Sequence, residues 1–162
     1  MAWVLYVLDV DAVQPGHCHV EAWAPKVPGI SEVLHARMVD YAYPAHCHET
    51  WAVLIVDDGA IRYDLDRRQC GAAGQTVTLL PPGVTHDGRP APGASGFRKR
   101  EIYLDCSFFP AELTGAAVDN TSISDPPLRP SSRSCMTACW RGRKPWTRRR
   151  GSRGSESGSP AI

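Results

Sequence analysis

The sequence predicts an all-β domain followed by a disordered basic tail, and two observations support this prediction. Short runs of β-branched and aromatic residues alternate with Gly, Pro and Asp, which is typical of antiparallel strands in a sandwich or barrel. From residue 131 onward the composition changes to Arg, Ser and Gly, without a hydrophobic period that favours a helix or strand. We therefore expect a folded domain at residues 27–130 and a disordered tail at residues 131–162.

Length and charge limit the class of protein. The 162 residues leave room for one folded domain. Residues 131–162 hold eight of the 18 basic residues and one of the 17 acidic ones, so residues 1–130 carry 10 basic against 16 acidic residues. An acidic domain repels phosphate, and we expect this chain to show no specific nucleic-acid binding.

The amino-terminal region predicts neither an export signal nor a membrane anchor. Asp9 and Asp11 interrupt the apolar start, and no basic leader precedes it. The six cysteines form no CxxC pair, which favours reduced thiols and a cytoplasmic protein. Because the following residues are rich in Pro and Gly, we expect residues 1–26 to be irregular.

The predicted strands follow the β-branched and aromatic runs. In chain order they are residues 31–43, which form one or two strands, and residues 50–56, 60–66, 75–80 and 97–105. Asp57, Asp58 and Gly59 separate the second run from the third, and Asp-Gly favours a tight hairpin turn at this point. Pro81 and Pro82 end the fourth run, because proline cannot donate to a strand ladder.

Three histidines are the candidate site. In an extended segment, His46 and His48 leave the same face of the strand. His86 follows the Pro81-Pro82-Gly83 turn and is expected to converge on them at the mouth of a barrel. The residues alone leave three interpretations open: a zinc or iron site with three imidazole ligands, a polar ligand pocket, or structural histidines with hydrogen-bonded rings.

Two motifs and the segment between them resemble a known family. "YPAHCHETWAVLIVDDGAIRYDLDRR", the later Gly74 and "LLPPGVTHDG" are together similar to the cupin domain at the amino end of AraC-type transcription regulators. The resemblance extends over about residues 27–129. It implies a cupin-like double-stranded β-barrel (jelly roll) that senses a sugar-like or other small-molecule effector and forms a homodimer. In that family a separate domain with two helix-turn-helix motifs reads DNA.

The metal ligands of the wider cupin family are incomplete in this sequence. Metal-binding cupins place a glutamate several residues after the second histidine, whereas here Glu49 follows His48 directly. We therefore expect no metal, no cofactor and no catalytic residue. The alternative is a small metal-dependent cupin enzyme of isomerase or dioxygenase type, in which His46, His48 and His86 would hold the metal.

Three aromatic residues near these motifs are candidates for stacking on a sugar ring. The residues expected to contact the effector are His46, His48, Trp51, Tyr63, His86 and Tyr103.

The tail suggests a further hypothesis about its coding sequence. Cys135, Cys139 and Trp146 lie where Leu codons of the CTG type would be read one frame away. The codons shared by neighbouring residues then restore apolar positions at the i, i+4 spacing of a helix. We accordingly interpret residues 131–162 as a frameshifted reading of a regulator's linker helix, and the chain as a regulator truncated before its DNA-reading domain.

Overall fold

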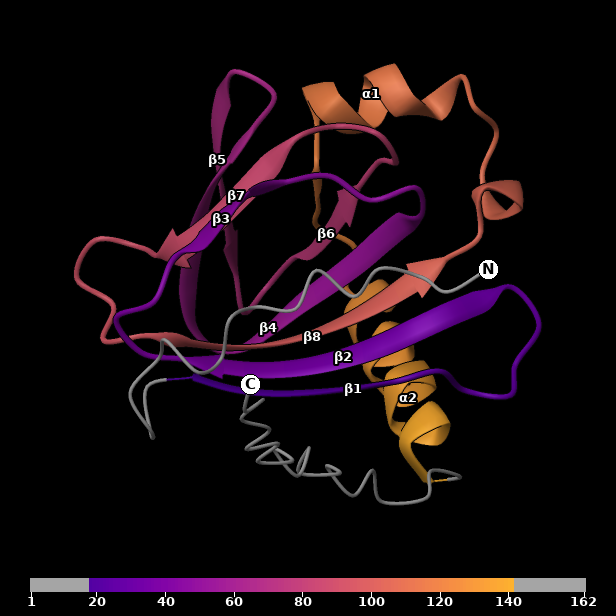
Figure 1. Cartoon of the computed structure of the whole chain (residues 1–162), viewed down its shortest axis with the longest axis horizontal. Coiled ribbons are helices and arrows are strands. Elements are labelled where there is room, and N and C mark those ends of the chain that lie inside the picture. The colour runs from indigo at the N-terminus through magenta and orange to yellow at the C-terminus, as the bar shows by residue number, and fades with distance from the viewer. Residues whose placement is uncertain (1–17, 142–162) are drawn as a thin grey trace, which may run out of the picture.

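The computed structural model describes residues 18–141, which form two antiparallel β-sheets that share one long strand (Figure 1). The elements are β1 (Cys18–Trp23), β2 (Ile30–Met38), β3 (Tyr43–His46), β4 (Trp51–Leu65), β5 (Arg68–Ala73), β6 (Val77–Leu80), β7 (His86–Pro90), β8 (Phe97–Leu104), a 3₁₀ turn η2 (Cys106–Phe108), α1 (Leu113–Asp119), β9 (Ser122–Ile123) and α2 (Leu128–Arg141). The predicted all-β barrel is confirmed.

The long strand β4 joins the two sheets. Its first half pairs with β6 and β8 in the sheet β1-β2-β8-β4-β6-β9, and its second half pairs with β5 and β7 in the sheet β3-β7-β4-β5. All of these pairings are antiparallel. Because one strand serves both sheets, residues of β4 contact the barrel interior along nearly its whole length.

The predicted hairpin turn at Asp57–Gly59 is wrong, because β4 runs through it. The register against β8 shifts between Val56 and Asp58, so Asp57 is the extra residue of a β-bulge. Gly59 adopts φ +72°, and a Cβ atom there would lie 2.1 Å from the carbonyl oxygen of Gly96. The bulge and the glycine bend the strand from one sheet into the other instead of reversing it.

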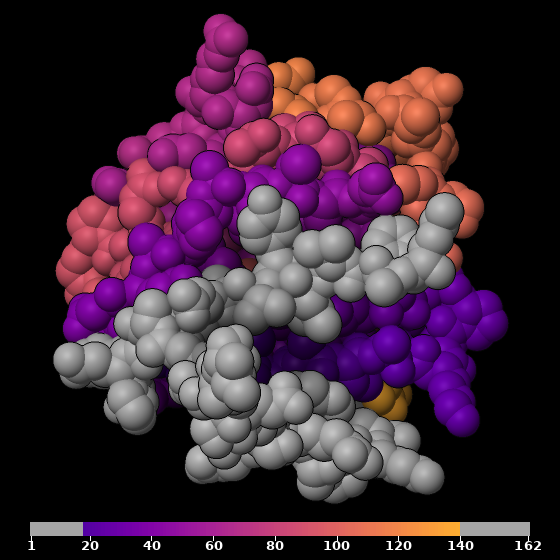
Figure 2. Space-filling view, in the orientation of Figure 1, coloured from indigo at the N-terminus to yellow at the C-terminus, as the bar shows by residue number. Residues whose placement is uncertain are grey.

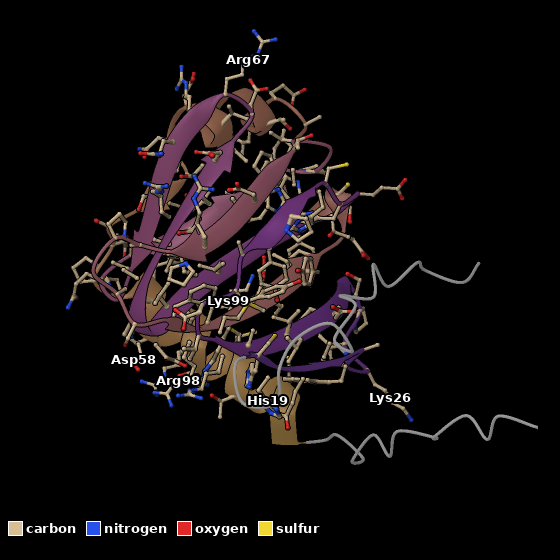
Figure 3. The ribbon with its side chains drawn as sticks, turned by 60° about the vertical axis from the view of Figure 1, so that its left-hand side comes forward. His19, Lys26, Asp58, Arg67, Arg98 and Lys99 are labelled. Carbon is tan, nitrogen blue, oxygen red and sulfur yellow. The ribbon has the colours of Figure 1, made fainter. Side chains whose placement is uncertain are left out.

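The chain reverses at the end of β4 instead. Asp66 adopts φ +55°, a left-handed conformation that aspartate tolerates in tight turns. Its backbone N–H donates to the carbonyl of Thr85 at 2.8 Å, which ties the turn to the segment before β7. The tip of the β4–β5 hairpin projects from the surface in Figure 2, and Figure 3 labels Arg67 at this tip.

The amino-terminal expectation also needs correction. Residues 18–23 form the edge strand β1, whose register runs from Cys18 opposite Met38 to Trp23 opposite Val33. Alternation decides this segment, because Cys18, Val20 and Ala22 pack against the interior core while the residues between them face outward. Residues 1–17 lie outside the described part of the chain.

Two hydrophobic clusters lie on opposite faces of the first sheet. The interior cluster fills the space between the sheets: Leu34, Ala36, Met38, Ala52, Leu54, Val56, Ile61, Tyr63, Leu65, Ala72, Leu80 and Phe97. The outer cluster lies beneath the helices: Val33, Trp51, Ile55, Val77, Ile102, Leu104, Ala117 and Met136. Neighbouring residues of β4 and β8 thus point into different environments.

Helix α2 contradicts the prediction of disorder for residues 131–141. Met136 is fully buried against the outer cluster, and Leu128 and Cys139 pack beside it. The indole N–H of Trp23 donates to the carbonyl of Cys139 at 3.1 Å. A sparse apolar stripe therefore exists in the sequence as written, and the frameshift hypothesis loses this premise. The frameshift itself stays a prediction, and residues 142–162 lie outside the described range.

Among residues 18–141, the structure contains no helix with the length and apolar composition of a membrane span.

Candidate functional site in the barrel interior

Three histidines from two regions of the chain meet at one end of the barrel. Ring centroids lie 4.5 Å apart for His46 and His86, and 4.9 Å apart for His48 and His86. The antiparallel pairing of β3 with β7 places His46 opposite His86. The structure therefore brings the three predicted histidines together.

Backbone carbonyls fix the orientation of all three rings. Each Nδ1 lies within hydrogen-bond distance of the carbonyl oxygen two residues away: 2.8 Å for His46, 2.7 Å for His48 and 3.0 Å for His86. A carbonyl oxygen only accepts, so Nδ1 carries the proton in each ring. In the neutral rings, Nε2 is consequently a hydrogen-bond acceptor.

The site favours neutral imidazoles. Burial lowers the pKa of His86 to about 4, and the neighbouring His46 and His48 rings act in the same direction. Burial also lowers the pKa of His48, although the carboxylate of Glu101 partly opposes this effect. His48 and His86 therefore carry no charge near neutral pH.

A charged pair on β8 lies deeper in the interior. The ammonium of Lys99 lies 2.6 Å from a carboxylate oxygen of Glu101, whose side chain is 2% exposed. The same ammonium lies 4.8 Å from the ring centroid of Tyr43, within cation–π range. Burial alone raises the pKa of Glu101, but Lys99 holds this pKa below its ordinary value. Figure 3 labels Lys99 between the two sheets.

Two of the predicted tyrosines also line the interior. The Tyr103 ring packs edge-on against His48, with the ring centroids 5.3 Å apart. Burial raises the pKa of Tyr103 well above its ordinary value. The hydroxyl of Tyr63 lies 2.6 Å from Oγ1 of Thr121, and burial raises the pKa of Tyr63 to about 12. Both tyrosines are therefore protonated hydrogen-bonding groups at neutral pH.

Trp51 does not join this group. Its side chain is 1% exposed and belongs to the outer cluster, with its ring 5.2 Å from that of Phe109. Ala52 and Leu54, which follow Trp51 on β4, belong to the interior cluster instead. The structure therefore does not bring Trp51 together with the three histidines, because the strand turns this side chain toward the helices.

A small cavity lies between the histidines and the charged pair. Its volume is about 30 Å³, enough for about two waters. Its polar lining includes Tyr43, His46, Tyr63, Thr78, His86, Lys99 and Glu101. Two polar atoms of this lining are buried without a hydrogen bond, the Tyr43 hydroxyl and Oγ1 of Thr78. Nε2 of His48, whose ring lies beside that of the lining residue His86, is buried without a partner as well.

Comparison with known families identifies this architecture. Residues 28–148 match the AraC-like ligand binding domain family. The chain belongs to this family. The match covers the complete barrel from β2 onward and continues through α2, so both parts are components of the AraC-like domain.

Solved structures of cupin proteins are similar to this AraC-like domain at low identity. A cupin 2 conserved barrel domain protein from Leptotrichia buccalis is 17% identical, with 60% of this chain and 45% of that chain covered and a TM-score of 0.49. A cupin superfamily protein from Desulfitobacterium hafniense is 12% identical, with 59% and 86% covered and a TM-score of 0.46. Oxalate decarboxylase from Bacillus subtilis is 13% identical, with 67% and 28% covered and a TM-score of 0.49. No curated protein sequence matches the chain.

The interior residues of this domain do not fit the metal centre known from other cupins. Within residues 18–141, no group of three or more His, Cys, Asp and Glu side chains is arranged to hold a metal ion. The nearby carboxylate of Glu101 is bonded to Lys99.

Sequence reasoning missed Tyr43, Thr78, Lys99 and Glu101. A signal for the last two exists in "FRKREIYL", where Lys99 and Glu101 alternate with outward residues and share a face with Phe97 and Tyr103. Charges on the same face of a strand as buried aromatic residues indicate a polar interior site.

Proposed function

We propose that this domain is the effector-sensing domain of an AraC-type transcription regulator, and that it binds a small, neutral, hydroxyl-bearing effector between its two sheets. The observation that carries the proposal is the set of unpaired buried polar atoms on Tyr43 and Thr78 in the cavity lining and on His48 beside it. Buried polar groups are normally hydrogen-bonded, and each unpaired one needs an explanation. A ligand that pairs with all three supplies that explanation.

The chemistry of these atoms favours hydroxyl groups. Nε2 of His48 accepts a hydrogen bond, whereas the hydroxyls of Tyr43 and Thr78 both donate and accept. Lys99 and Glu101 already neutralise each other, so the interior offers no net charge to an ionic ligand. Rings of Tyr43, His46 and His86 supply apolar faces beside these groups. A neutral sugar or polyol matches this combination.

The size of the cavity links binding to a change of shape. The space of about 30 Å³ is far below the roughly 300–1,000 Å³ of ordinary ligand pockets. A sugar therefore enters only when the sheets or the segment between β2 and β4 move apart. A ligand that binds the open arrangement better than the closed one shifts the balance between them, which is the physical requirement for a sensor.

The test is a thermal-shift and calorimetry screen of neutral monosaccharides and polyols against the purified chain. We expect at least one compound to raise Tm with a saturable concentration dependence. Tyr43→Phe and Thr78→Val remove the unpaired hydroxyls with little change of shape, and each should weaken that binding about tenfold while leaving stability nearly unchanged. His19→Ala is the matched control, because the His19 side chain is 72% exposed.

Binding that survives both substitutions unchanged would place the ligand elsewhere and contradict the proposal. Saturable binding of anions or cations in preference to neutral compounds would contradict the ligand class. A metal-dependent cupin enzyme has no specific observation in its favour, because the described histidines and carboxylates form no metal-holding group.

The proposal includes pairing of two copies, as the family resemblance implies. Sedimentation equilibrium of the purified chain should give twice the mass of one chain, 17.7 kDa, at micromolar concentration. A monomer with and without bound effector would contradict this part of the proposal.

A further inference from the structure

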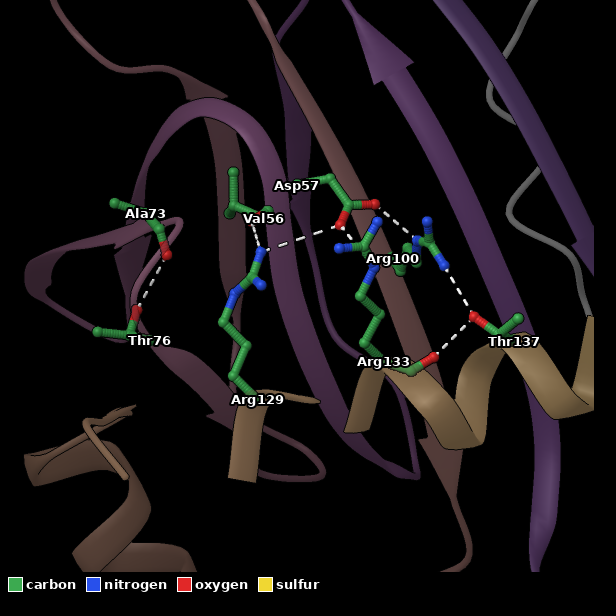
Figure 4. Close-up of polar contacts among 8 residues, drawn as sticks. All are labelled: Val56, Asp57, Ala73, Thr76, Arg100, Arg129, Arg133 and Thr137. Carbon is green, nitrogen blue, oxygen red and sulfur yellow. Dashed lines mark hydrogen bonds and ion pairs between the residues drawn. The ribbon is translucent and has the colours of Figure 1, made fainter. Parts of the chain in front are cut away.

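A buried carboxylate holds helix α2 on the barrel. Asp57, the bulge residue of β4, is 4% exposed and accepts from Nε of Arg100 at 2.6 Å (Figure 4). Two arginines of α2 face its other oxygen, Arg129 at 3.9 Å and Arg133 at 3.7 Å. We call these four residues the Asp57 cluster. One negative charge thus serves three guanidinium groups.

The cluster holds α2 from two sides. Arg129 donates to the carbonyl of Val56, next to Asp57, at 2.8 Å. Arg100 donates to Oγ1 of Thr137 on α2 at 3.2 Å, and Thr137 donates to the carbonyl of Arg133 at 2.8 Å. Without Asp57, these contacts would bring three positive charges together in a partly buried place.

The contact between Asp57 and the helix arginines is incomplete. Oδ1 of Asp57 and Nε of Arg129 are buried without a hydrogen-bond partner. The helix arginines therefore face this oxygen only at ion-pair distance, while Arg100 makes the close contact. Small shifts of Arg100 consequently change how strongly Asp57 attracts the two helix arginines.

Arg100 lies between the two residues of the interior charged pair. Along β8, Lys99 and Glu101 point into the barrel and bond to each other, while Arg100 points outward to Asp57 and α2. On β4, Val56 contacts both regions: its side chain packs in the interior core, and its carbonyl accepts from Arg129. Three consecutive residues therefore join the cavity to the helix.

We propose that Arg100 couples the effector cavity to helix α2, so that a change at the Lys99–Glu101 pair loosens or tightens the docking of α2 through the Asp57 cluster. This inference rests on the proposed function, because it assigns the output of the same site. A ligand that bonds to Glu101 or Lys99 weakens their mutual contact and moves the backbone of β8. Arg100 then loses its fit to Asp57 and Thr137, and α2 is released.

The experiment measures amide hydrogen exchange of α2 in the full chain without any ligand. Asp57→Asn removes the charge that the arginines share, and α2 amides should exchange about tenfold faster or more. Glu101→Gln removes the interior charge and changes no residue of the Asp57 cluster, and it should speed exchange of α2 by about three- to thirtyfold. In the double variant, the increase in the exchange rate of α2 should be smaller than the product of the two single-variant increases, because both substitutions act through Arg100.

Two matched controls separate coupling from general loosening. Asp58→Asn changes the exposed neighbour of Asp57, which forms none of the cluster contacts, and His19→Ala changes a side chain of β1 that is 72% exposed. Both should leave α2 at wild-type rates, and amides of β4 and β8 should stay protected in every variant. If Glu101→Gln does not fold, Lys99→Met combined with Glu101→Leu removes the buried pair while preserving an apolar interior.

Three results would overturn the inference. The first is an unchanged exchange rate of the α2 amides in Asp57→Asn, which would show that apolar contacts alone hold α2. The second is an unchanged α2 exchange rate after the interior substitutions. The third is an increase in the double variant that equals the product of the two single-variant increases. Because no effector is added, a negative exchange result would not contradict the proposed ligand binding. A negative ligand screen would likewise not contradict the coupling of the interior pair to α2.

Discussion

The imidazole rings of His46 and His86 lie 4.5 Å apart, centroid to centroid, at positions that pair across β3 and β7. His48 lies 4.9 Å from the same His86 ring. Burial lowers the pKa of both His48 and His86, and like charges at these distances would repel strongly in a desolvated site. The cluster therefore makes the domain sensitive to acid.

The first prediction concerns pH. The pKa of His86 is lowered to about 4 in the folded state, whereas an unfolded histidine titrates near 6.5. As pH falls from 6.5 toward 4, the unfolded chain takes up a proton that folded His86 does not. The free energy of unfolding should therefore fall by up to about 1.4 kcal/mol per pH unit, or about 3 kcal/mol over this interval.

Urea denaturation between pH 7 and 5 checks this prediction above the range where most carboxylates titrate. His86→Asn keeps a side-chain N–H for the Val84 carbonyl but does not titrate, so its stability should depend less steeply on pH. Equal slopes for the wild type and this variant would contradict the assigned pKa.

The second prediction tests the bend in β4. Gly59→Ala places a Cβ atom 2.1 Å from the Gly96 carbonyl oxygen, so the backbone of β4 or β8 must move. The free energy of unfolding should fall by about 3 kcal/mol or more. Gly93→Ala is the matched control, because Gly93 has φ +82° with nothing within 4 Å of a new Cβ. It should cost only about 1–2 kcal/mol, and equal losses would refute the close approach.

The third prediction concerns α2. Met136 is fully buried in the outer cluster, and Met136→Ala should cost about 2–4 kcal/mol in urea denaturation. The neighbouring Cys135 is exposed, so Cys135→Ala should change stability by less than about 0.5 kcal/mol. A negligible effect of Met136→Ala would mean that α2 does not pack on the barrel.

The fourth prediction concerns the hydrogen bond between Tyr63 and Thr121. Tyr63→Phe leaves the buried Thr121 hydroxyl unpaired, and it should cost about 1–3 kcal/mol. Thr121→Val should cost a similar amount, whereas the double variant should recover part of the loss because neither polar group remains. Strictly additive losses in thermal unfolding would show that the two hydroxyls do not bond.

The strand β8 shows how much the sequence alone could predict. Its β-branched and aromatic content correctly predicts a strand, but both of its faces mix charged and apolar residues. Lys99 and Glu101 look like solvent-facing residues until β2 and β4 enclose them, and Arg100 looks exposed until α2 covers it. Strand pairing and helix docking decide these positions, and neither can be derived from the local sequence.

The errors elsewhere have similar causes. Asp-Gly at Asp58 and Gly59 is a strong local turn signal, but pairing with β8 on one side and β5 and β7 on the other keeps β4 extended. In α2 the apolar residues Leu128, Met136 and Cys139 are too sparse to suggest a helix, and the outer face of the sheet supplies their partners. The histidine cluster could be predicted because its motifs fix both side-chain direction and turn.

Nitrogen-15 correlation spectra of the histidine side chains test the central claim most directly, with the purified chain titrated by the best compound of the ligand screen. Before titration, the spectra should show neutral rings protonated on Nδ1 for His48 and His86 at neutral pH. On titration, the Nε2 resonances of His46, His48 and His86 should move to saturation while those of exposed His19 stay in place. A saturable compound that leaves the three interior histidines unmoved would contradict the claim that the barrel interior is the effector site.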